Sequence, residues 1–95
     1  MDRNDEKSIE TLYKAFTLIS DEAECKKFFS DLCTPVELLE MAGRLKTAIM
    51  LSQGQSYNEV IQATGMSSAT ISRVNKCLET GSGYLAVIKK LGGEN

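Results

Sequence analysis

The feature that most constrains the fold of this 95-residue chain is the stretch 55–79, QSYNEVIQATGMSSATISRVNKCLE. Ser56 and Glu59 open it with a helix-start signal, because each side chain can accept a hydrogen bond from the other residue's backbone N–H. Gly65 ends this first helix, at a point where a tight turn calls for a positive φ. Either of the two serines after Met66 can cap a second helix. The stretch therefore predicts two short helices joined by a sharp turn.

Apolar residues in this stretch are spaced as in a helix-turn-helix, in which two crossing helices and their turn lock together. The four locking positions are Val60, Met66, Ile71 and Val74. Leu78 continues the stripe of the second helix at a step of four residues. Ile61 departs from the pattern, because it stands where a small residue usually lies near the crossing. The angle at which the two helices cross is therefore not predicted.

The opposite side of the second helix is polar and basic. Its residues are Ser68, Ala69, Ser72, Arg73, Asn75 and Lys76. Small side chains allow close approach to a DNA groove, hydroxyls and amides suit base edges, and arginine and lysine suit guanine or phosphate. The same pattern fits a helical hairpin in a bundle whose outer face contacts nothing.

A resemblance favours the DNA-binding interpretation. GMSSATISRVNKCL, preceded by SYNEVIQATG, resembles the DNA-reading unit of the Trp-repressor-like family and is closest to its YerC/YecD branch. FFSDLCTPVELLEMAGRLKTAIMLSQG, just upstream, matches the central region of the family in order and spacing, so the resemblance covers about residues 10–90. It implies an all-α fold of six helices, an intertwined homodimer and a sequence-specific transcriptional regulator, most often a repressor.

Net charge is −2, which by itself counts against DNA binding. The charge is unevenly distributed, since residues 1–24 hold seven acidic and three basic residues while residues 55–93 hold two acidic and four basic ones. DNA binding needs local positive potential rather than a positive total. Four bases are nevertheless few for one copy, which favours a dimer on double-stranded DNA.

We expect one all-α domain without an internal linker. Its parts are a disordered arm (1–7), dimerisation core helices (8–54), the helix-turn-helix (55–79) and a C-terminal helix with a tail (80–95). The third helix, from about Pro35 to Ser52, is apolar on more than one side and is expected at the centre of the molecule. Gly81 and Gly83 are expected to end the recognition helix.

Large aromatic side chains in the first two helices bear on the oligomeric state. For so short a chain, these two helices carry a large number of bulky aromatic residues, namely Phe16, Phe28 and Phe29. In the resembled family these helices interlace with a second copy, which predicts an obligate homodimer. The alternative is that the aromatic residues fill the core of a monomer.

An enzyme is not expected. The chain has no histidine, and its cysteines, Cys25, Cys33 and Cys77, are not spaced as a metal or redox pair. We interpret them as small buried apolar residues, and we expect no metal and no cofactor. No apolar run is long enough to span a membrane, and the acidic start differs from an export signal, so we expect a cytoplasmic, nucleoid-associated protein.

The resemblance also implies a degenerate ligand pocket, made of Thr34, Arg44, Arg73, Val74 and Cys77. Arg44, Arg73 and Thr34 match residues around the tryptophan bound by the Trp repressor. Val74 replaces a glycine there and would occupy the space of the indole ring, while Cys77 replaces a serine and is a poor acceptor for an ammonium group. We therefore expect no tryptophan binding and no small-molecule effector.

The expected contacts with DNA come from the starts of both helices of the motif and from the outer face of the second. They are Ser56, Ser67, Ser68, Ala69, Thr70, Ser72, Arg73, Asn75 and Lys76. The alternative function is a protein-interaction module that uses the same surface, which the acidic balance of the chain favours slightly.

Overall fold

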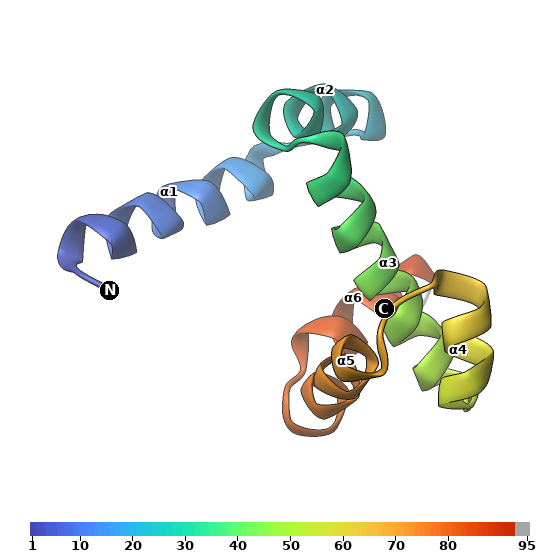
Figure 1. Ribbon diagram of the computed structural model, residues 1–95. Helices are drawn as coiled ribbons and strands as arrows, with labels where there is room; N and C mark the ends of the chain where they lie inside the picture. The colour runs from blue at the N-terminus through green and yellow to red at the C-terminus, as the bar shows by residue number, and fades with distance from the viewer. Residues whose placement is uncertain (93–95) are drawn as a thin grey trace. The chain divides into compact units, whose positions relative to one another are not determined.

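The computed structural model describes residues 1–92 and contains six α-helices in that range, with no strand (Figure 1). They are α1 (Arg3–Leu18), α2 (Glu22–Leu32), α3 (Pro35–Ser52), α4 (Tyr57–Thr64), α5 (Ser68–Thr80) and α6 (Gly83–Leu91). The expected all-α fold of six helices is confirmed. The chain forms two compact units, Met1–Pro35 and Val36–Asn95, called here the N-terminal and C-terminal units.

The N-terminal unit begins with a helix where a disordered arm was expected. Asp2 caps α1 by accepting a hydrogen bond from the backbone N–H of Asp5 at 2.9 Å, and the Asp5 carboxylate accepts from the N–H of Asp2 at 3.3 Å. This reciprocal pair satisfies two N–H groups that a helix start otherwise leaves free. The prediction of disorder over residues 1–7 is therefore wrong, because α1 already starts at Arg3.

Three phenylalanines join α1 to α2 in this unit. Phe16 stacks on Phe29 with ring centroids 5.4 Å apart and meets Phe28 edge-on at 5.7 Å. All three rings are only half-buried, and no residue of α1 or α2 is fully buried. Leu18 remains 78% exposed. The N-terminal unit thus has packed aromatic contacts but little core of its own.

The C-terminal unit contains the predicted helix-turn-helix. Ser56 and Glu59 form the expected reciprocal cap of α4, with N–H to oxygen distances of 3.2 and 3.1 Å. Gly65 follows α4 with a φ of 71°, a conformation that costs little only for glycine. Ser67 caps α5 by accepting from the N–H of Thr70, which decides between the two candidate serines.

The end of α5 differs in one detail from the expectation. The helix ends at Thr80, and the N–H of Gly81 donates to the carbonyl of Cys77 at 2.9 Å. Gly83 does not end this helix but begins α6. The connection between the two helices is therefore shorter than expected.

The core of the C-terminal unit lies where α3, α4 and α5 meet (Figure 1). Its buried residues are Thr47, Ala48, Val60, Ile71 and Val74. Three of the four predicted locking residues belong to this set. The fourth, Met66, is half-buried and lies over Gly43, since a β-carbon added there would overlap its methyl group.

Burial along α3 is uneven. Its C-terminal half carries Thr47 and Ala48, both fully buried, as expected for a central helix. Its first turns are open within one chain, with Val36 65% and Leu39 71% exposed. Ile61 is the large residue at the position where a small one usually lies near the helix crossing. It is 37% exposed beside the fully buried Val60, so its bulk lies at the edge of the crossing. Among the described residues, no helix is long and apolar enough to cross a bilayer.

Candidate nucleic-acid interface

The outer face of α5 is open to solvent, and its inner face is firmly held. Ile71 is fully buried and Val74 is 3% exposed, so these two side chains anchor the helix to the rest of the unit. The exposed residues between and beside them are Ser68, Ala69, Ser72, Arg73 and Lys76. We call this set the α5 outer face. A supported helix with small, hydroxyl-bearing and cationic side chains turned outward is suited to a major groove.

Two candidate residues at the start of α5 are engaged within the chain. The Ser67 hydroxyl accepts from the Thr70 N–H at 3.2 Å and lies 3.1 Å from the Thr70 hydroxyl. Thr70 is half-buried and lines a 160 Å³ cavity beside Arg44. These residues shape the start of α5, and a DNA contact from either would have to share an existing hydrogen bond.

Asn75 is also tied to its own helix. Its amide nitrogen donates to the Glu79 carboxylate at 3.0 Å, and the residue is half-buried. Residues four apart on a helix are neighbours, so the sequence contained the signal for this pair. The pair places a negative charge near the C-terminal end of the outer face.

Ser56 lies exposed at the start of α4, but both its groups serve the cap. Its hydroxyl accepts from the N–H of Glu59, and its own N–H donates to the Glu59 carboxylate. The Ser56 N–H, and secondly the Ser56 hydroxyl, lower the pKa of Glu59 below its ordinary value. Glu59 therefore keeps its negative charge beside any phosphate that approaches the start of α4.

Four of the five residues predicted for a degenerate ligand pocket come together. Arg44, Arg73, Val74 and Cys77 line the 160 Å³ cavity. Thr34 belongs to the N-terminal unit. The side chain of Val74 is almost wholly buried, as expected for a residue that fills the space between helices. Cys77 is exposed rather than buried, contrary to expectation, whereas Cys25 and Cys33 are half-buried.

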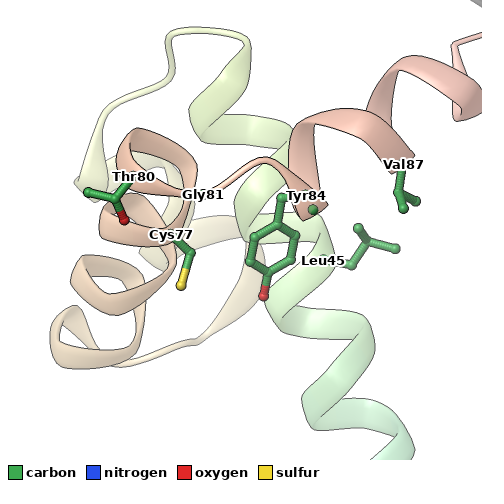
Figure 2. Close-up of a pocket in the computed structure, with 7 residues that line it drawn as sticks. Leu45, Cys77, Thr80, Gly81, Tyr84 and Val87 are labelled. Atoms are coloured by element: carbon green, nitrogen blue, oxygen red, sulfur yellow. The ribbon is translucent and has the colours of Figure 1, made fainter. Parts of the chain in front are cut away.

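The structure adds Tyr84, a residue that the sequence did not single out. Tyr84 comes from the first turn of α6 and completes the lining of the 160 Å³ cavity. It also lines a neighbouring cavity of about 610 Å³ (Figure 2), with Leu45, Cys77, Thr80, Gly81, Gly83 and Val87. The sequence showed an apolar last helix but contained no local signal for which element that helix contacts.

A family model supplies the decisive comparison. The model described as Trp repressor protein matches residues 7–91, nearly the whole chain. The chain belongs to the Trp repressor family. Members of this family are helix-turn-helix DNA-binding regulators, so this protein is a DNA-binding regulator of the same type and not a member of an enzyme family.

Individual relatives of this Trp repressor family member agree with that assignment. The uncharacterized protein YerC of Bacillus subtilis strain 168 is 42% identical over 76 residues, which are 80% of this chain and 73% of YerC. A TrpR-like protein from Eubacterium eligens shares 38% identity with a TM-score of 0.85, over 94% of this chain and 93% of that one. A crystal structure from Staphylococcus aureus, assigned as a Trp repressor, shares 31% identity with a TM-score of 0.84, over 97% and 96%.

Proposed function

We propose that this regulator binds a palindromic site in double-stranded DNA as a homodimer, and that it represses transcription without tryptophan as co-repressor. The observation that carries the proposal is the exposed α5 outer face on a buried base of Ile71 and Val74. In a two-fold dimer, two such faces would enter successive major grooves about 34 Å apart.

The dimer is supported by apolar surface that one chain leaves open. α1 and α2 contain no buried residue, and Tyr13 is 62% exposed. At the start of α3, Val36 and Leu39 are more than half exposed. Burial of such side chains is worth about 1.5–3 kcal/mol each, and a second copy supplies the matching surface. Residues 8–54 would form this dimerisation core, so that residues 1–95 act as one domain within the dimer.

Light scattering at micromolar concentration tests the dimer. We expect twice the mass of one chain, 10.4 kDa. A well-folded monomer at that concentration would contradict the proposal and favour the alternative in which the aromatic residues fill a monomer core.

The proposed contacts come from three groups of residues. Arg73 and Lys76 supply charge for phosphates or for guanine, and Ser68 and Ala69 approach base edges, where the Ala69 methyl group suits thymine. Further contacts are proposed from residues that are engaged within the chain, namely Ser56, Ser67, Thr70 and Asn75, together with the exposed Ser72. Few of these side chains are long, so we expect much of the sequence reading to be water-mediated or based on DNA shape.

The absence of tryptophan binding is proposed from the lining of the pocket. Arg44 and Arg73 lie on a cavity of about 160 Å³ that Val74 and Cys77 also line. Val74 takes up space on one wall. Calorimetry with L-tryptophan is expected to give no heat of binding, and a micromolar dissociation constant would overturn this part of the proposal.

Salt dependence separates DNA binding from the second candidate function, a protein-interaction module. The net charge of −2 and the carboxylates of Glu59 and Glu79 near the proposed surface favour the second candidate. If the surface binds duplex DNA, affinity falls steeply between low and moderate salt because counterions are released from phosphates. No retention on DNA at low salt would favour the protein-interaction module. With DNA as its partner, the protein would be nucleoid-associated in the cytoplasm.

A further inference from the structure

Tyr84 stands where the two neighbouring cavities of the C-terminal unit meet. It lines the 160 Å³ cavity with Arg44 and Val74, and it lines the 610 Å³ cavity with Leu45. Cys77 of α5 is the other residue that both linings share. The Tyr84 side chain is therefore part of the partition between the two spaces.

Three helices meet at this ring. Tyr84 belongs to α6, and in Figure 2 its ring lies between Leu45 of α3 and Cys77 of α5. The side chain is half-buried, and within the described residues its hydroxyl makes no hydrogen bond. The ring therefore acts through its volume and its apolar faces rather than through its polar end.

The C-terminal half of α5 is less deeply buried than its start. The buried anchors of α5, Ile71 and Val74, lie in its first two turns. Beyond them Leu78 is only half-buried, while Cys77 and Thr80 are exposed and both border the larger cavity. Without the Tyr84 ring the two cavities would join, and the end of α5 would lose the aromatic side chain between itself and α3.

We propose that Tyr84 is a positioning residue that holds α5 at a fixed spacing from α3. The orientation of the α5 outer face is then fixed by the chain itself, without a bound ligand. The effect on DNA reading rests on the proposed function. The packing role of the ring does not, and it has its own readout. A cavity left by an aromatic side chain can accept a small aromatic molecule of the same shape.

Three variants test the proposal. Tyr84→Ala removes the ring, Tyr84→Phe keeps the ring without its hydroxyl, and Leu85→Ala truncates the neighbouring residue of α6, which lines neither cavity. The probe is p-cresol, which has the structure of the lost side chain. Each variant is measured for mass by light scattering, for thermal midpoint with and without millimolar p-cresol, and for affinity to duplex DNA.

We expect Tyr84→Phe and Leu85→Ala to bind duplex DNA with the affinity of the unchanged protein. We expect p-cresol to change neither their affinity nor their thermal midpoint. We expect Tyr84→Ala to remain helical, to bind DNA roughly tenfold more weakly, and to regain both affinity and thermal midpoint with p-cresol, because a ligand that binds the folded state stabilises it. If Tyr84→Ala does not fold, the same measurements are made on Tyr84→Leu. We expect this variant to lose less affinity for DNA and to gain nothing from p-cresol, because the leucine side chain fills part of the space.

The outcomes separate the two proposals. If the unchanged protein does not bind duplex at low salt, the proposed function fails, while stabilisation of Tyr84→Ala alone by p-cresol still supports the packing role. If Tyr84→Ala binds DNA as the unchanged protein does, the positioning role is wrong. If p-cresol stabilises Tyr84→Ala no more than Leu85→Ala, the packing role is wrong as well.

Discussion

Gly65→Ala offers a direct test of how the turn between α4 and α5 is held. Gly65 has a φ of 71°, and an added β-carbon would meet no atom of residues 1–92 within 4 Å. The cost of the substitution is therefore a backbone cost without a packing component. Placing an L-residue in this left-handed region costs about 1–2 kcal/mol, and we expect the free energy of unfolding to fall by that amount.

The chain offers a matched control for this prediction. Gly83 also has open space around an added β-carbon, but its φ is not positive and it lies in the first turn of α6. Alanine is favoured over glycine in a helix by up to about 1 kcal/mol, so Gly83→Ala should be neutral or stabilising. Gly54, with a φ of 85° and equally open surroundings, should behave like Gly65.

Urea unfolding followed by circular dichroism, at one fixed protein concentration, measures all three variants. We expect Gly65→Ala and Gly54→Ala to lose stability and Gly83→Ala to lose none. A Gly65→Ala variant as stable as the unchanged protein, or a Gly83→Ala variant that loses as much as Gly65→Ala, would show that the positive φ does not set the cost.

Three further predictions follow from single contacts. Thr47→Val should raise the free energy of unfolding by about 1 kcal/mol, because the Thr47 hydroxyl is fully buried and has no hydrogen-bond partner among residues 1–92. Thr47→Ser, which keeps the hydroxyl and loses the methyl group, should lower this free energy in the same urea titration. Because the pKa of Glu59 is lowered on folding, its carboxylate adds stability at pH values above the unfolded pKa of 4.5, and this stability is lost as the pH falls through the folded pKa. Glu59→Gln should therefore be less stable than the unchanged protein at pH 7 and should approach its stability at low pH. An equal difference in stability at neutral and at low pH would contradict this role of Glu59. Arg73→Ala should weaken DNA binding by about 1–3 kcal/mol in an anisotropy titration, whereas Lys14→Ala, on α1, should bind with unchanged affinity.

Local signals predicted most of the helix-turn-helix. Ser56 with Glu59, and Gly65 at the turn, act within a few residues of their own position, so their geometry follows from spacing alone. The spacing of Val60, Ile71 and Val74 predicted their burial, because helical periodicity fixes which side chains share a face.

Two features were not predicted, although the sequence contained a signal for each. Asp2 and Asp5 have the spacing of a helix cap, but the charged start of the chain favoured an interpretation as a disordered arm. Asn75 and Glu79 are one helical turn apart, and the amide was nevertheless expected to be free for DNA. In both cases a short-range hydrogen bond between polar residues outweighed the general polarity of the segment.

The position of Tyr84 could not be predicted in the same way. Tyr84 of α6 lines one cavity with Leu45 of α3 and Cys77 of α5, and such an arrangement depends on how helices distant in sequence pack together. The exposure of Cys77 has the same origin, because it is set by the open cavity around it and not by its place on α5.

Selection of bound sequences from a pool of random DNA duplexes tests whether paired α5 outer faces read a two-fold symmetric site. We expect an enriched palindromic motif whose half-sites are about one helical turn apart. The same selection with Arg73→Ala should lose or broaden that motif. Recovery of no motif, or of a motif that Arg73→Ala leaves unchanged, would show that the α5 outer faces do not read such a site.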